Sequence, residues 1–226
     1  MVPSTGCGCR PVRPFERQER LRKSRPRGAS STTPASDHGA RGQTLVEFAL
    51  VFPLFFTLII GFIEFAFMFN AVLSVTFATR DAALLAVEVG STTGTDCVVL
   101  KTIEDDVSAP ADHAQISAVD IYRAKSNGDP YGGGTTTTWS RTGSTTCTMT
   151  DLTTVTVPYT RTINGYPEAS RCNVLAGCGT GHPSVDYVGV TVHYSYRYVT
   201  PIKTFITTGT TLDFERSNVM RMEPIL

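Results

Sequence analysis

The longest hydrophobic stretch of the chain lies between residues 45 and 69. Its sequence is LVEFALVFPLFFTLIIGFIEFAFMF, in which Glu47 and Glu64 are the only charged residues. An α-helix rises about 1.5 Å per residue, so about twenty apolar residues cross the hydrocarbon core of a bilayer. The stretch is therefore long enough to span a membrane once.

Two other interpretations fit this stretch less well. A buried helix of a soluble protein usually keeps a polar face, whereas residues 48–63 are apolar on every side. A cleavable secretory signal has an apolar region of about 7–15 residues that ends at a small-residue cleavage site, and this stretch is longer. We therefore interpret residues 45–69 as a membrane-spanning helix.

A helical pattern continues beyond the apolar stretch. Gly90, which Ser91 follows, ends this pattern. One helix is therefore expected from about Thr44 to Val89, with its first half in the membrane and its second half in an outside domain. The pattern positions recur at steps of three and four, the period of an amphipathic helix: Val72, Leu73, Thr76, Phe77, Arg80, Ala83, Leu84 and Val87.

Strand patterns replace helical ones after Gly90. The clearest is Tyr187–Tyr198, where Val and Tyr alternate with small or polar residues, as in a half-buried strand. A small antiparallel sheet packed against the projecting half of the helix follows, which is an α+β fold. The other expected elements are a short helix within 95–109, strands at 114–124, 151–159 and 211–222, a loop at 126–147 with Gly132–Gly134 supplying flexibility, and a bend at Pro201.

The charge distribution predicts how the chain is oriented across the membrane. Residues 1–42 carry nine Lys or Arg against three Asp or Glu, in a chain whose formal net charge is zero. They are poor in aliphatic side chains, so we interpret them as a disordered basic leader. A basic tail can also bind nucleic acid, but the apolar stretch that follows favours a membrane role. The positive-inside rule then places residues 1–42 in the cytoplasm and residues beyond about 70 outside.

The junction between leader and helix resembles a type IV prepilin. In that family a prepilin peptidase cuts after a glycine on the cytoplasmic side and leaves an acid at the fifth position of the mature chain. Here Gly42 is followed by Gln43, and Glu47 has that spacing. The resemblance therefore implies a leader of residues 1–42, a helix of 43–90 and an extracytoplasmic domain of 91–226.

The residue types suit this role. Glycine lets the backbone enter a protease without side-chain obstruction. An isolated carboxylate in lipid persists only where it gains a partner, and the new ammonium group of Gln43 on a neighbouring subunit would be one for Glu47. A second interpretation is that Glu47 only interacts with the positive end of the helix dipole.

The sequence from Gly42 to Phe67 is also similar to the start of the TadE-like proteins, minor pseudopilins of the Tad (Flp) pilus system. In that family a membrane proline and a second acid recur, at the positions of Pro53 and Glu64 here. Pro53 can bend or loosen the helix during assembly, or it is an ordinary membrane kink. The segment 217–224, SNVMRMEP, is similar to the closing strand of the family. The leader is long for this class, which implies an added cytoplasmic role or a start assigned too far upstream.

Cysteines divide between the two sides of the membrane. Cys7 and Cys9 lie in the leader and would be reduced in the cytoplasm, where two cysteines alone make a weak metal site. The four outside cysteines predict two disulfides with three possible connectivities. We favour the pairing Cys172 with Cys178, across a short glycine-containing loop, and Cys97 with Cys147. A zinc site lacks the usual ligand spacing.

No catalytic constellation or cofactor motif emerges from the sequence. His113, His182 and His193 are scattered, and we expect His193 on the polar side of its strand. The resemblance implies a pilus-assembly or minor pilus protein, active in surface attachment, whose partners are the prepilin peptidase, other pilins, the inner-membrane assembly platform and the lipid bilayer, without nucleic acid. The alternatives are a permanently anchored surface-binding module, with recognition around Trp139 and Tyr131, and a membrane-tethered enzyme.

Overall fold

The structure is a computed structural model that describes residues 38–201 and 211–223, with the side chains of 38–41 excluded. The predictions made for residues 1–37, among them the reduced Cys7 and Cys9, lie outside these ranges, as does Pro224. The chain divides into two compact units, residues 1–46 and 47–226. In the first unit, residues 38–46 form the opening turns of a helix. The rest of this section concerns the second unit.

The long helix α1 runs from His38 to Val89. It therefore begins earlier than the expected Thr44, and no residue between His38 and Thr44 is a strong helix breaker like proline. It ends where the sequence predicts. Gly90 has φ of +67°, a left-handed conformation that terminates helices and that residues with a side chain rarely adopt.

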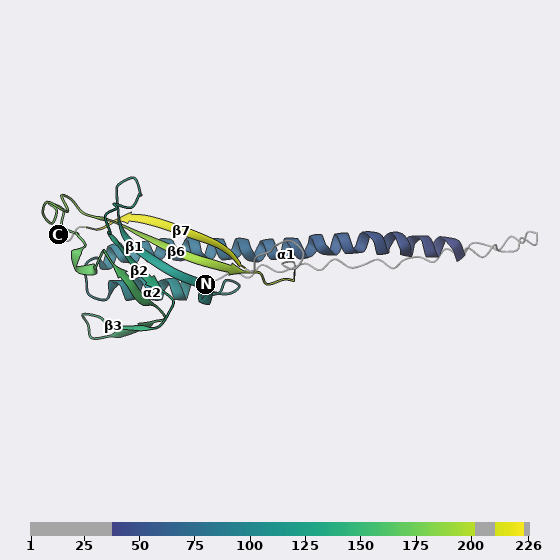
Figure 1. Ribbon diagram of the computed structural model, residues 1–226, viewed down its shortest axis with the longest axis horizontal. Coiled ribbons are helices and arrows are strands. Elements are labelled where there is room, and N and C mark those ends of the chain that lie inside the picture. The colour runs from purple at the N-terminus through teal and green to yellow at the C-terminus, as the bar shows by residue number, and fades with distance from the viewer. Residues whose placement is uncertain (1–37, 202–210, 224–226) are drawn as a thin grey trace, which may run out of the picture. The chain divides into compact units, whose positions relative to one another are not determined.

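The part of the chain after Gly90 contains a five-stranded antiparallel sheet in the order β5-β2-β1-β6-β7 and a two-stranded hairpin, β3-β4. Figure 1 shows β1, β6 and β7 alongside the second half of α1. The sheet strands are β1 (Ile116–Ala124), β2 (Thr136–Ser140), β5 (Thr160–Asn164), β6 (Tyr187–Arg197) and β7 (Thr211–Arg221). The remaining elements are α2 (Thr95–Asp106), η1 (His113–Gln115), β3 (Thr145–Thr148), β4 (Thr154–Val157) and η2 (Glu168–Ser170).

The core lies between the helices and one face of the sheet. On β6 the even-numbered residues from Val188 to Tyr196 are buried, and they share one core cluster with α1 and α2. Small side chains on α1 permit a close approach to the sheet, because they add little bulk between backbone and strands. The α1 residues in this cluster are Ala71, Val75, Ala78, Ala82, Ala83, Ala86 and Val87.

The hairpin β3-β4 packs on α2 rather than extending the sheet. Its Cys147 is joined to Cys97 of α2, and Val157 of β4 is fully buried. The helix α2 thus has the main sheet layer on one side and the hairpin on another. The fold is an α+β arrangement of a long apolar helix with an antiparallel sheet, as the sequence predicts.

Most predicted elements are present, and the prediction for one segment is wrong. The short helix and the strands at 114–124, 187–198 and 211–222 correspond to α2, β1, β6 and β7. The segment 126–147, expected to be a loop, contains β2 and β3 instead. Its runs of threonine next to tryptophan have high strand propensity, and pairing with β1 and β4 overrides the glycines before them. The strand β5 was not predicted.

Candidate functional site

The first half of α1 within the second unit presents its apolar side chains to the surroundings. Large side chains including Phe48, Leu50, Leu54 and Phe62 are between 63% and 75% exposed. Residues 42–89 form a helix long and apolar enough to cross a membrane, the one candidate among the described residues. An exposed apolar surface of this extent is unfavourable in water and requires lipid or protein around it.

The residues of the proposed processing site lie within α1. Gly42 and Gln43 are exposed positions of its opening turns, in the first unit, so the helix does not start after Gly42. Glu47 is likewise exposed, at the start of the second unit. A peptidase that needs extended backbone at Gly42 would have to unwind this end of the helix.

Pro53 does not interrupt α1. The helix is continuous through it, and the hydroxyl of Thr57 donates a 2.8 Å hydrogen bond to the Pro53 carbonyl. The missing N–H of proline removes one backbone hydrogen bond from this turn. The helix is therefore locally weaker here while remaining helical.

Glu64 of α1 is buried and accepts several hydrogen bonds. Its side chain is 5% exposed although it follows a run of exposed apolar residues. The carboxylate accepts hydrogen bonds from the Tyr196 hydroxyl at 2.6 Å, from the Val199 amide at 3.1 Å and from the Thr200 amide at 2.7 Å. These donors lie at the end of β6 and just beyond it, so we call the four residues the Glu64 clasp. The clasp joins α1 to the end of β6.

Beyond Glu64 one side of α1 remains apolar and exposed while the opposite side is buried against the sheet. Phe65, Phe69, Leu73 and Phe77 follow one another at steps of four, and their exposed fractions lie between 39% and 59%. The rings of Phe65 and Phe69 stack with centroids 6.2 Å apart. We call these four residues the outer stripe.

Both disulfides in the structure have the pairing favoured from the sequence. Cys97 is joined to Cys147 with Cα atoms 6.2 Å apart, and Cys172 to Cys178 with Cα atoms 5.7 Å apart. The first disulfide ties the hairpin to α2. The second closes a short loop whose base is bound to Asp186 through the Cys172 amide, at 3.1 Å.

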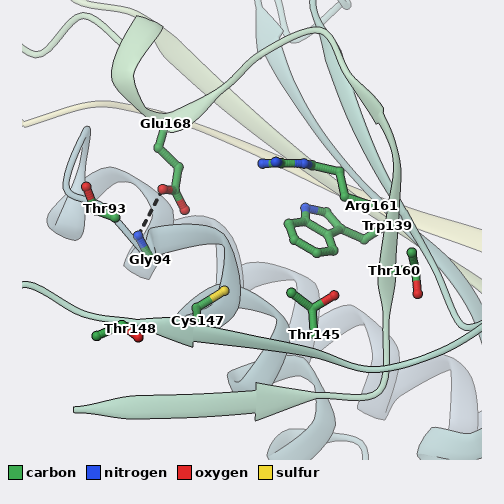
Figure 2. Close-up of a pocket in the computed structure, with 9 residues that line it drawn as sticks. All are labelled: Thr93, Gly94, Trp139, Thr145, Cys147, Thr148, Thr160, Arg161 and Glu168. Atoms are coloured by element: carbon green, nitrogen blue, oxygen red, sulfur yellow. Dashed lines mark hydrogen bonds between the residues drawn. The ribbon is translucent and has the colours of Figure 1, made fainter. Parts of the chain in front are cut away.

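A cavity of about 440 Å³ lies beside the first disulfide. Figure 2 shows Arg161 over the Trp139 ring, with Glu168 on the opposite side of the cavity. Glu168 accepts hydrogen bonds from the backbone amides of Gly94 and Asp96, at 2.9 and 2.7 Å, and so caps the start of α2. Glu168, Thr145 and Trp139, which line this cavity, are each hydrogen-bonded to other parts of the domain.

Trp139 does not form the exposed recognition surface expected for the surface-binding alternative. It belongs to β2, is 3% exposed and donates its Nε1–H to Asp96 at 3.3 Å. Tyr131 is half exposed, with the Arg123 guanidinium 4.2 Å from its ring centroid. The expectation that Trp139 is an exposed contact residue is therefore wrong, because the strand turns its side chain into the core.

Two buried carboxylates organise the loops between β5 and β6. Asp96 forms an ion pair with Arg171, and both side chains are almost inaccessible. Asp186 accepts from Arg123 Nε at 2.9 Å and from the Tyr166 hydroxyl at 2.9 Å, and it lies 2.8 Å from His182 Nδ1. Each carboxylate has more than one partner within the domain, which indicates a structural role, whereas Arg171 Nε and Nη1 are buried without a hydrogen-bond partner among the described residues. His182 and Asp186 are four positions apart, whereas Asp96 and Arg171 are 75 positions apart, so no local sequence pattern contained the second contact.

His193 lies on the outer face of the sheet, between two carboxylates. Its Nε2 is 2.9 Å from Asp120 of β1, and its Nδ1 is 3.4 Å from Glu215 of β7. The hydrogen bond to Asp120 raises the pKa of His193 above its usual value, against the opposing effect of partial burial. Burial alone would raise the pKa of Asp120, but hydrogen bonds from His193 and Thr138 lower it.

This arrangement joins strands rather than forming a reaction centre. His193 is half-buried on the polar side of β6, as expected from the alternation. No group of three or more His, Cys, Asp or Glu side chains within residues 38–201 and 211–223 is placed to hold a metal ion. The exposed first half of α1 and the outer stripe are two features of the described chain that its own stability does not explain.

Comparison with known families points to the same helix. The family model described as TadE-like protein matches residues 42–84, which confirms the resemblance over that segment. The match begins at Gly42, includes Glu47, Pro53 and Glu64, and does not extend to residues 217–224. No curated protein and no solved structure matches the chain significantly.

Proposed function

We propose that this chain, which carries a TadE-like segment at residues 42–84, is a pseudopilin of a Tad-type pilus. It is cut by a prepilin peptidase after Gly42 and acts in pilus assembly or as a minor subunit. The observation that carries the proposal is that the family match starts at Gly42 and covers the exposed apolar half of α1. TadE-like pilus proteins are in general not enzymes, and the role proposed here is structural.

Glu47 is the residue proposed to register subunits. After cleavage its carboxylate would pair with the terminal ammonium group of Gln43 on a neighbouring subunit. Its exposed position on α1 leaves the side chain accessible to a neighbour. A carboxylate in lipid costs several kcal/mol when it is unpaired, so the pairing would favour one axial position of the incoming helix.

Other pilins are the proposed neighbours along the helix. The outer stripe continues the apolar surface of α1 beyond Glu64, on the side that the sheet leaves uncovered. Helices with phenylalanine and leucine at steps of four pack well against similar helices. Burial of the stripe in a filament would remove it from water.

The location proposed for the chain is the inner membrane, from which it can enter a filament. The basic leader would lie in the cytoplasm and residues beyond the span outside, where the two disulfides are stable. The partners proposed there are the peptidase, the assembly platform and the lipid bilayer. A role of the finished pilus in surface attachment follows from the same proposal.

Replacement of Glu47 tests the registration step. Glu47→Ala should insert into the membrane normally but should enter or initiate few pili, and Glu47→Gln should behave in the same way because it lacks the charge. Glu88→Ala is the matched control, since Glu88 is an exposed acid on the same helix. The readouts are the amount of chain in membranes and the amount of pilus sheared from cells. Normal piliation by both Glu47 variants would contradict the registration role.

A further inference from the structure

The Glu64 clasp marks the place where α1 leaves the outside domain. Residues before Glu64 in the second unit have no fully buried side chain, whereas buried positions recur from Ala71 onward. Glu64 itself is held by three donors from the end of β6. The helix is therefore bound to the domain from Glu64 and is free of it before that residue.

The length of the free segment matches a bilayer. Leu45–Ile63 contains nineteen residues, of which only Glu47 is charged. At 1.5 Å per residue this segment is about 29 Å long, close to the roughly 30 Å hydrocarbon core of a membrane. A span of this length ends directly at Glu64 rather than at Phe69.

Three exposed apolar side chains lie near the point where the helix leaves the domain. Val199, whose amide binds Glu64, is 63% exposed. Leu212 is 41% exposed and pairs across the strands with Tyr196, which donates to Glu64. Phe65, next to Glu64 on the helix, is 58% exposed. We call Val199, Leu212 and Phe65 the collar.

Polar groups beside the collar suit a membrane surface. Tyr198 is half-buried against Tyr196, and tyrosine rings are enriched where membranes meet water. Arg197 is exposed, and its guanidinium can bind lipid phosphate. The Glu64 carboxylate has three hydrogen-bond donors, so it can lie at this depth without an unpaired charge facing lipid.

We propose that the collar docks on the outer leaflet and inserts Val199, Leu212 and Phe65 into the phospholipid interface, so that the base of the domain rests on the bilayer before assembly. The partner is the phospholipid surface, because the collar continues directly from the helical segment that crosses the lipid. This inference rests on the proposed membrane span. It adds that the domain contacts the membrane through Val199, just beyond β6, and through Leu212 of β7, as well as through its helix.

Tryptophan quenching by brominated lipid tests the docking. The full chain is reconstituted into phosphatidylcholine vesicles that contain phosphatidylcholine brominated near the glycerol end of one acyl chain. Val199→Trp and, as a second reporter, Leu212→Trp are compared with unmodified chain, whose single Trp139 is buried and supplies the background. Val174→Trp is the matched control, because Val174 is 45% exposed and adjoins Asn173, which lies beside Gly90 at the far end of α1 from Glu64.

The expected result is that both collar reporters are quenched more strongly than Val174→Trp, with emission shifted to shorter wavelength. Quenching no stronger than in the control, in chains that float with the vesicles, would overturn the docking while the membrane span stands. A shifted emission without quenching would show that protein covers the collar, which also contradicts the proposal. Failure of unmodified chain to float would contradict the span, and with it the anchoring part of the proposed function.

Discussion

Two glutamates of the helix α1 differ in exposure: Glu47 is exposed and Glu64 is buried. Glu47 is exposed on the free part of α1, where a neighbouring subunit can reach it. Glu64 is buried and accepts three hydrogen bonds from its own chain. A carboxylate that is satisfied within its own subunit has little to gain from a second partner. We therefore assign Glu64 to the internal structure of the subunit. The contact of Glu47 with a neighbouring subunit is part of the proposed function and is tested by its own variants.

Removal of the Glu64 carboxylate should loosen the base of the domain. Glu64→Ala leaves the Tyr196 hydroxyl and two backbone amides without their acceptor, at a cost of about 1–3 kcal/mol of local stability. Amide hydrogen exchange at Val199 and Thr200 should accelerate accordingly, by roughly tenfold or more. Glu88→Ala, at an exposed site on the same helix, should leave these amides unchanged. Unaltered protection in Glu64→Ala would contradict the clasp.

His193 should make stability depend on pH near neutrality. Because its pKa is raised in the folded state, its interaction with Asp120 contributes fully below the unfolded pKa, at about 6.5, and is lost as the pH rises through the folded pKa. The lost contribution is on the order of 0.5 kcal/mol, since the pair is partly exposed. Thermal unfolding of the detergent-solubilised chain should show this decrease as the pH rises above the unfolded pKa of about 6.5. His193→Gln should abolish that pH dependence, and a variant that keeps it would contradict the assignment.

At the scale of elements, the hairpin β3-β4 depends on its disulfide. Cys97 and Cys147 are separated by 50 positions, whereas Cys172 and Cys178 are separated by 6. Cross-linking a longer loop restricts the unfolded chain more strongly, which gives about 4 kcal/mol for the first bond and about 2 kcal/mol for the second in the chain-entropy estimate.

Replacement of both cysteines of each pair by serine should separate these contributions. The Cys97→Ser, Cys147→Ser variant should lose more unfolding free energy in denaturant titrations than the Cys172→Ser, Cys178→Ser variant. Limited proteolysis of the first variant should cut between β3 and β4, because the hairpin loses its tie to α2. Equal losses in the two variants would contradict the loop-length argument.

Local sequence patterns predicted the elements in which hydrophobic and polar residues recur with a clear period. The alternation in β6 identified both its limits and its buried face, and the glycine after Val89 identified the end of α1. The strands β2, β3 and β5 were missed because they are short, rich in threonine and close to glycines. The structure of β2 and β5 depends on pairing with β1 and with each other, which no local pattern contains.

At the scale of the whole molecule, the sequence located the residues of the proposed assembly site but not their neighbours. Gly42, Glu47 and Pro53 were found because the motif is contiguous. Glu64 was found as well, yet its partners Tyr196, Val199 and Thr200 lie more than 130 positions away and were not predicted. Contacts of this separation are determined by tertiary packing, so the clasp could be recognised only in the structure.

The proposed pilus role of the whole molecule depends on cleavage of the leader after Gly42. The most direct measurement is the intact mass of the chain recovered from membranes, with and without the prepilin peptidase of the host cell. We predict a mature chain that begins at Gln43 only when the peptidase is present, with allowance for cyclisation of the terminal glutamine. A chain that keeps residues 1–42 in both cells would contradict it and would leave α1 as a permanent anchor.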